Sequence, residues 1–140
     1  MRSEEECIKY ASDCWDKGFN CAESAMRGVC YGQGIDLPEV ALKMATPFGA
    51  GIGKSEDVCG ALTGSVLGIG ASLGRTDPKG NKALSYAAAK ELKSLFEKRF
   101  SSVQCKVLNK GDFESQEHER RCKEFMLESV RTAYSILNKK

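Results

Sequence analysis

The sequence predicts an all-α fold: a single-domain bundle of five to six helices around a buried, glycine-rich central helix. Strand signals are weak, because β-branched and aromatic residues never alternate with polar ones over five or more positions. Apolar residues instead recur at intervals of three and four, behind recognisable helix-capping residues. A chain of 140 residues can form one core but hardly two. We therefore expect one helical domain over residues 1–140.

The first two predicted helices each begin at a capping residue, which is part of a capping box in the first. Ser3 with Glu6 opens a helix that Gly18 ends, and its apolar stripe carries two of the cysteines. Asn20 with Glu23 opens the next helix, which should continue to the YGQG segment at residues 31–34.

Two further helices are expected in the middle of the chain. Asp36, followed by Leu-Pro-Glu, is a typical opening for a helix that ends near Pro47. Ser55 is the predicted N-cap of the next helix, which covers the uncharged run at residues 58–74. That run is slightly short of the roughly 18–20 residues that cross a bilayer, so it predicts a buried helix and no membrane span. Three glycines four residues apart leave one side of this helix nearly bare: Gly60, Gly64 and Gly68. Another helix can approach there closely, either within the chain or across a homodimer seam.

The second half of the chain predicts two long helices joined by a loop. Residues 81–98 and 115–137 carry apolar stripes at helical spacing, and lysine and glutamate occupy the other faces. The segment between them, residues 100–113, is expected to be a loop with one short helical turn at Cys105.

Charge and composition exclude several classes of function. The 21 basic and 19 acidic residues nearly balance and are interleaved, so nucleic-acid binding is disfavoured. The N-terminus is charged and lacks the apolar core of a secretory signal, so a cytoplasmic protein is expected. Seven cysteines without such a signal do not suggest a secreted disulfide framework, and there is no CxxC pair. Metal binding or redox chemistry is the usual reason for surplus cysteine in a reducing compartment.

The segment GAGIGKS at residues 49–55 invites comparison with a phosphate-binding loop. The first glycine of that motif would have to be residue 48, which is Phe48, and no parallel sheet is predicted to hold the loop. The loop can instead bring backbone close to a helix start, where N–H groups and the helix dipole stabilise an anion. Cys21 and Cys59 both lie near predicted helix starts, which favours lowered thiol pKa values, with Lys54 adding to the effect at Cys59. The alternative is that both are small buried apolar side chains.

Several segments resemble the bacterial C_GCAxxG_C_C family, whose name implies redox activity. The resemblance rests on FNCAES at residues 19–24, on FGAGIGKSEDVCGALTG at residues 48–64, and on the later cysteines at 105 and 122. The family signature has four cysteines, and the resemblance implies that they correspond here to Cys21, Cys59, Cys105 and Cys122. It implies a thiol or electron-transfer role for them.

Three interpretations of these four cysteines stay open. In the first, the chain is a thiol–disulfide oxidoreductase that reacts with a redox partner protein or a small oxidant. Our expected pairs are Cys21 with Cys59 and Cys105 with Cys122, Cys59 should react fastest, and the other two pairings are not excluded. In the second, all four bind zinc or an iron–sulfur cluster. In the third, this is a non-catalytic helical interaction domain whose cysteines pack in the core.

The remaining candidate side chains are expected to have structural roles. Cys7 and Cys14 lie two turns apart on the apolar stripe of the first helix, and Cys30 lies near the end of the second, so core packing is predicted for all three. His118, the single histidine, lies in the polar run SQEHERR and is predicted to face solvent.

Overall fold

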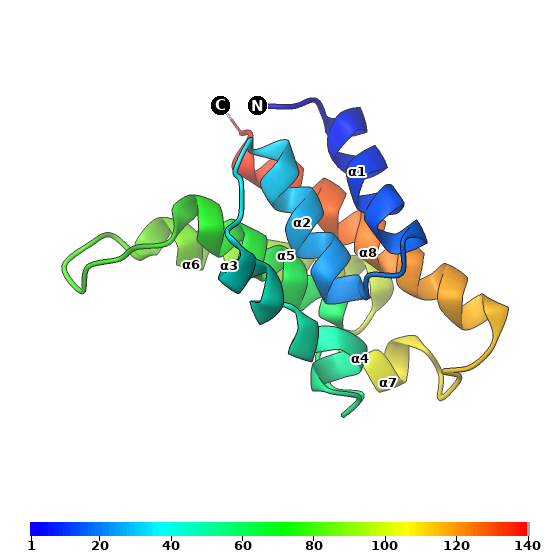
Figure 1. Cartoon of the computed structure of the whole chain (residues 1–140). Helices are drawn as coiled ribbons and strands as arrows, with labels where there is room; N and C mark the ends of the chain where they lie inside the picture. Colours follow the sequence, from blue (N-terminus) through cyan, green and yellow to red (C-terminus); the bar gives the residue numbers. More distant parts are fainter. Residues whose placement is uncertain (140) are drawn as a thin grey trace.

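Five helices of twelve or more residues account for most of the computed structural model, which describes residues 1–139 (Figure 1). They are α1 (Glu4–Asp16), α2 (Cys21–Gly32), α5 (Gly60–Leu73), α6 (Ala83–Phe100) and α8 (Gln116–Leu137). Shorter elements connect them: α3 (Glu39–Met44), the 3₁₀ turn η1 (Thr46–Phe48), α4 (Gly49–Ile52) and α7 (Cys105–Leu108). Within residues 1–139 the only β pairing is an isolated antiparallel bridge between Val58 and Gln104. The predicted all-α bundle is confirmed.

The predicted starts of α1 and α2 are confirmed, whereas the predicted starts of α3 and α5 are wrong. Ser3 and Asn20 each form a complete capping box, with side-chain and backbone hydrogen bonds in both directions. The third helix begins at Glu39 with Pro38 as its N-cap, so Asp36 caps nothing. Ser55 likewise caps no helix, because α5 starts only at Gly60.

A contact with a distant part of the chain delays the start of α5. The Cys59 N–H donates to the carbonyl of Val103 at 2.7 Å, and the Cys105 N–H donates to the carbonyl of Asp57 at 2.6 Å. These two bonds flank the Val58–Gln104 bridge and hold residues 57–59 in extended backbone. Cys59 is therefore the N-cap of α5 and not a residue one turn inside it.

Helix α5 is the central helix, as predicted, and its glycine side faces α2 (Figure 1). A Cβ added at Gly64 would lie 2.3 Å from the carbonyl oxygen of Ala22, so no larger residue fits without moving backbone. On another side of α5, the buried hydroxyls of Ser65 and Ser129 are 3.0 Å apart, and Ser129 donates to the Ala61 carbonyl at 2.9 Å. The glycine side is thus used for packing inside the chain, which removes its support for a homodimer seam.

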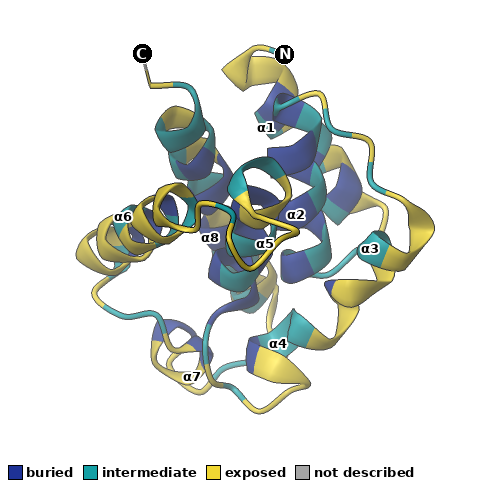
Figure 2. Cartoon of the chain, turned by 90° about the vertical axis from the view of Figure 1, so that its left-hand side faces the viewer, coloured by how far each residue is buried: buried dark blue, intermediate teal, exposed yellow. Residues whose placement is uncertain are grey.

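The core lies where α1, α2, α5, α6 and α8 meet, and α6 turns an exposed face outward (Figure 2). The short helices α4 and α7, far apart in sequence, lie side by side at one end of the bundle. Among residues 1–139 no helix is both long and apolar enough to cross a membrane. The first turns of α2 and α5 lie near this same end, and this is where the predicted thiols come together.

Candidate functional site

Four of the seven cysteines line one cavity of about 160 Å³. They are the four that the family resemblance selected, and each comes from a different helix. Cys21 is the first residue of α2, Cys59 is the N-cap of α5, Cys105 is the first residue of α7, and Cys122 lies in the second turn of α8. The other lining residues include Trp15, Asn109, Phe113 and His118. The structure brings these four thiols together from positions up to 101 residues apart in the chain.

The other three cysteines lie outside this cavity, among apolar side chains. Cys7 belongs to the main core and donates to the Gly28 carbonyl at 3.1 Å. Cys30 packs in a smaller cluster with Met26 and Ala45. Cys14 is also buried, and all seven thiols are free. The predicted packing role of these three is consistent with their burial.

Local structure explains the position of Cys21. The Asn20 capping box fixes the first turn of α2: the Glu23 N–H donates to the Asn20 side chain at 2.8 Å, and the Asn20 N–H donates to the Glu23 carboxylate at 2.9 Å. The Asn20 side-chain amide also donates to the Thr46 carbonyl at 3.1 Å. The thiol then lies directly against the start of α5, because a Cβ added at Gly60 would be only 2.5 Å from the Cys21 sulfur. A glycine at position 60 is what leaves room for this sulfur.

The β-bridge sets the direction of two more thiols. Successive side chains in extended backbone point to opposite faces. Because Val58 and Gln104 are the bridged residues, Cys59 and Cys105, each one position later, both point to the opposite face. That face is the cysteine cavity.

A backbone segment in an unusual conformation closes the cavity on a further side. Four residues other than glycine between positions 50 and 56 have positive φ: Ala50, Ile52, Lys54 and Glu56. Each left-handed residue of this kind costs on the order of 1–2 kcal/mol, and such residues concentrate at functional sites. The turn directs the Ala50 N–H toward the Cys21 sulfur, where it favours the thiolate.

A polar cluster around Asn109 joins Cys105 to Cys122. The buried Asn109 amide donates to the Cys105 carbonyl at 3.1 Å and lies 3.7 Å from its sulfur. Its oxygen lies 3.0 Å from His118 Nδ1 and accepts from Arg121 at 3.4 Å and Cys122 at 3.8 Å. An amide oxygen can only accept, so His118 Nδ1 carries the proton and Nε2 is free to accept one. The Cys122 sulfur lies 3.6 Å from Nδ1 and 3.8 Å from Nε2.

The prediction that His118 faces solvent is therefore wrong. Its ring is half-buried, lines the cysteine cavity and lies edge-on to Phe113. The sequence signal that could have found it is the four-residue spacing between His118 and Cys122, which puts both on one helical face. Asn109 has no comparable signal, since the NKG segment at 109–111 is typical of an ordinary turn.

Burial dominates the electrostatics of the site, so the predicted lowering of the thiol pKa values is wrong. Loss of water raises the pKa of Cys59 well above its ordinary value, the nearby charge of Cys21 adds to this, and the N–H groups of Ala61 and Leu62 oppose it. Burial also raises the pKa of Cys21, against the N–H groups of residues 50, 21, 22 and 60. The helix-start groups act in the predicted direction, but desolvation is the larger effect.

The other two thiols behave in the same way. Burial, followed by the charges of Cys21 and Cys105, raises the pKa of Cys122 to about 12, against the effects of Asn109 and Arg121. Burial and then the charge of Cys21 raise the pKa of Cys105. Cys21 thus lies within electrostatic reach of all three other thiols, and at neutral pH all four are protonated in the reduced protein.

Access to the cavity is uneven. Cys21 and Cys122 are half-buried, whereas Cys59 and Cys105 are each 5% exposed. A second hollow of about 450 Å³ shares Ala50, Phe113 and His118 with the cavity. Lys54 lines that hollow, together with Glu56 and Glu114, so Lys54 belongs to the entrance.

The present side-chain positions do not form a metal centre. Within residues 1–139 no three or more His, Cys, Asp or Glu side chains are placed so that they could hold one ion together. A zinc or iron–sulfur centre at these four cysteines would require the thiols to rotate toward a common point and lose their protons.

Comparison with known proteins gives one match. The sequence profile of the family described as "Putative redox-active protein (C_GCAxxG_C_C)" matches residues 19–136, which include all four cavity cysteines and exclude Cys7 and Cys14. No curated protein and no solved structure matches the chain.

Proposed function

The chain belongs to the C_GCAxxG_C_C family, and on that premise we propose that its four cavity cysteines form a dithiol–disulfide redox centre. The observation that carries the proposal is that all four line one small cavity beside an entrance. Burial supports this chemistry because both stable states are uncharged: two thiols on one side of the reaction and a disulfide on the other. Only the short-lived thiolate is costly in such a site.

Cys21 is the thiol that reacts first in this proposal. Residue 21 as a whole is half-buried, whereas Cys59 is 5% exposed, so Cys21 is the more exposed of the two residues. Four backbone N–H groups, from Ala50, Ala22, Gly60 and Cys21 itself, favour its thiolate. The preference for Cys59 that its sequence position suggested is therefore replaced by Cys21.

The substrate class is a disulfide, either on a partner protein or in a small molecule. The Cys21 sulfur attacks one sulfur of the substrate disulfide, that S–S bond breaks, and the released thiolate takes the proton that Cys21 loses. The Cys59 thiol then attacks the Cys21 sulfur, and the second substrate thiol leaves with the Cys59 proton. In total two protein thiols are oxidised to one disulfide, and one substrate disulfide is reduced to two thiols.

The second pair can take over the disulfide inside the cavity. Cys122 loses its proton to His118 Nε2 and attacks the Cys21 sulfur; the Cys21–Cys59 bond breaks, and Cys59 leaves as a thiolate that takes the proton back from the histidine. The Cys105 thiol then attacks the Cys122 sulfur, the Cys21–Cys122 bond breaks, and Cys21 leaves with the Cys105 proton. The products are a Cys105–Cys122 disulfide and two reduced thiols at Cys21 and Cys59. This proposal makes Asn109 a positioning residue, because it contacts both members of the second pair and fixes the histidine tautomer.

The test is to incubate the reduced protein with oxidised glutathione, quench with acid, and identify disulfides by mass spectrometry. We expect an intramolecular disulfide among the cavity cysteines, and a Cys21→Ser variant that reacts at least about tenfold more slowly. Cys14→Ala, a buried cysteine outside the cavity, should react as the wild type does. A Cys21→Ser variant as fast as the wild type would contradict the assignment.

Metal analysis of protein purified without oxygen tests the alternative centre. About one equivalent of zinc, or of an iron–sulfur cluster, lost when any cavity cysteine is replaced, would favour the metal-binding interpretation over thiol exchange. Uniformly slow thiols with no metal would leave a helical interaction domain with packing cysteines.

A further inference from the structure

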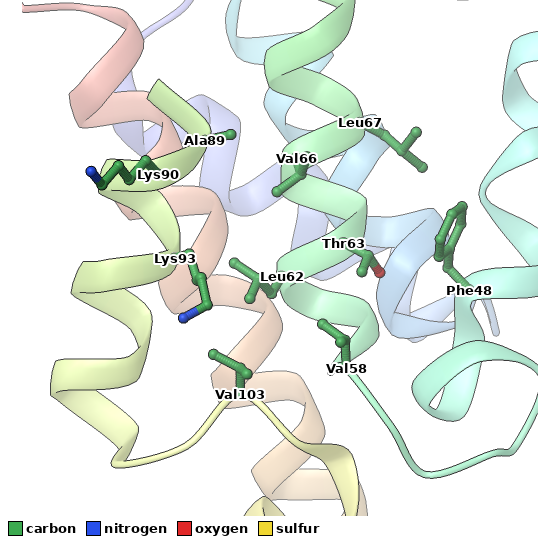
Figure 3. Close-up of a pocket in the computed structure, with 10 residues that line it drawn as sticks. All are labelled: Phe48, Val58, Leu62, Thr63, Val66, Leu67, Ala89, Lys90, Lys93 and Val103. Atoms are coloured by element: carbon green, nitrogen blue, oxygen red, sulfur yellow. The ribbon is translucent and has the colours of Figure 1, made fainter. Parts of the chain in front are cut away.

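A second and larger cavity lies beside the central helix, between α5 and α6. Its volume is about 540 Å³, within the range of small-molecule sites. Figure 3 shows α5 along its floor, Ala89, Lys90 and Lys93 of α6 on one side, and Phe48 on the other. Val58 and Val103 lie at one end. We call this cavity the α5–α6 groove.

The walls of the groove are almost entirely apolar. Seven of its ten lining residues are apolar: Phe48, Val58, Leu62, Val66, Leu67, Ala89 and Val103. Of the other three, Thr63 already bonds its own helix, with its hydroxyl donating to the Gly60 carbonyl at 3.3 Å. The floor belongs to a helix that has no charged residue on any side from Gly60 to Leu73. A helix that is apolar all round is normally covered on all sides.

The two remaining lining residues are lysines of α6. Lys90 and Lys93 both line the groove, and Figure 3 draws the Lys93 ammonium group at the α6 edge and that of Lys90 pointing away from α5. Lys93 forms an exposed ion pair with Glu97 at 3.1 Å, which is a weak interaction, and no acidic side chain among residues 1–139 pairs with Lys90. No acidic side chain lines the groove. The groove thus combines an apolar body with a positively charged edge.

We propose that the α5–α6 groove binds an amphipathic carboxylate, an aliphatic chain with an anionic head. The chain would lie over Leu62, Val66 and Leu67, and the head would meet the Lys93 ammonium group at the α6 edge. Branched aliphatic side chains dominate the walls, which suits a flexible alkyl chain better than a flat polar ring. None of the four cavity thiols lines the groove, so the proposal of a groove ligand stands or falls separately from the proposed redox reaction.

The probe is decanoate, with decanol and decylamine as ligands of equal chain length and different head. Titration calorimetry should give the highest affinity for decanoate, a lower affinity for decanol and the lowest for decylamine. Replacing both lysines by methionine should weaken the binding of decanoate by about fivefold, which is the size of effect that an exposed charge pair contributes. The affinity for decanol should stay unchanged. Amide shifts in NMR spectra should map to Val58, Val66 and Val103.

A pair of variants on α6 separates the groove from general effects. Ala89→Phe puts a ring into the groove, whereas Ala87→Phe puts the same ring on an exposed position of the same helix that does not line it. Decanoate binding should be lost in the first variant and kept in the second, with both helical by circular dichroism. Absent binding to the wild type, equal binding to Ala89→Phe, or equal binding of decanol and decanoate would overturn the proposal. A dimer that Ala89→Phe dissociates would also overturn it, because a second copy would then occupy the groove.

Discussion

Replacing Gly64 by alanine tests whether the contact between α2 and α5 determines the position of the thiol cavity. The added Cβ would lie 2.3 Å from the carbonyl oxygen of Ala22 and 2.8 Å from its Cα. Both are backbone atoms that cannot rotate away, so the helices must move apart, at a cost of about 1–3 kcal/mol. Alanine gains about 1 kcal/mol over glycine inside a helix. The net expectation is a loss of stability of up to about 2 kcal/mol.

Gly70 provides the matched control on the same helix. A Cβ added there meets nothing within 4 Å, so Gly70→Ala should keep the helical gain of about 0.5–1 kcal/mol without a clash. Urea unfolding followed by circular dichroism at 222 nm measures both variants. Because both variants receive the helical gain, they should differ by the cost of the close contact, about 1–3 kcal/mol, with Gly70→Ala the more stable. If Gly64→Ala proves as stable as Gly70→Ala, the reasoning about close approach is refuted.

The same variant has a chemical readout. Ala22 follows Cys21 directly in the first turn of α2, so a backbone shift at Ala22 also moves the Cys21 sulfur away from Gly60. Alkylation of Cys21 by iodoacetamide should therefore be faster in Gly64→Ala than in Gly70→Ala. Unchanged alkylation with a large loss of stability would mean that the cavity adjusts independently of the helix contact.

Three further predictions concern polar burial, alkaline pH and the groove. Asn109→Ala should lower the free energy of unfolding in urea by about 2–3 kcal/mol, because it leaves buried partners without hydrogen bonds; a loss below 0.5 kcal/mol (about the noise of such comparisons) would contradict this. Burial raises the pKa of Cys7 and of Cys30 to about 11, so stability should be constant below about pH 8.5. Above that pH each of these two thiols should remove up to about 1.4 kcal/mol of stability per pH unit until about pH 11. Replacing both by alanine should make the urea-midpoint profile less steep there, and the buried thiols that remain, such as Cys59 and Cys122, should keep part of the slope. Decanoate should slow hydrogen exchange of the Cys59 amide, because that N–H donates to the carbonyl of Val103, a residue that lines the groove. Unchanged exchange at saturating decanoate would argue against a coupling between groove occupancy and this hydrogen bond.

The parts of the fold that were predicted correctly depend on local signals. The capping boxes at Ser3 and Asn20 need only residues within one helical turn, and both form as expected. The cap at Ser55 had an equally good local signal and fails, because pairing of residues 57–59 with residues 103–105 keeps the backbone extended up to Cys59. The sequence contains no mark of that pairing, since its two segments are more than forty residues apart and neither has a strand pattern.

The candidate site shows the same difference between local signals, which the sequence contains, and long-range contacts, which it does not reveal. The resemblance to a family selected the four cysteines, and the structure brings their side chains to one cavity. The sign of the pKa shifts was wrong because the helix start is visible in the sequence, whereas the depth at which a thiol is buried is not. His118 was missed because its neighbours in sequence are charged, although its neighbours in space are Asn109 and Cys122.

The β-bridge gives the cysteine cavity and the α5–α6 groove a common wall. Val58 lines the groove, and Cys59, the next residue, lines the cavity. On the partner segment Val103 lines the groove, and Cys105 lines the cavity. Formation of a disulfide at Cys59 or Cys105 draws that sulfur toward its partner. The movement acts on the three backbone hydrogen bonds that join residues 56–59 to residues 103–106, in which Cys59, Cys105 and Lys106 donate to the carbonyls of Val103, Asp57 and Glu56. The oxidation state of the thiols and the occupancy of the groove should therefore influence each other, and linkage requires the effect to be equal in both directions. The affinity for decanoate can be measured on fully reduced and on fully oxidised protein, and the thiol–disulfide equilibrium constant with and without saturating decanoate. The two affinities should differ by the same factor as the two equilibrium constants.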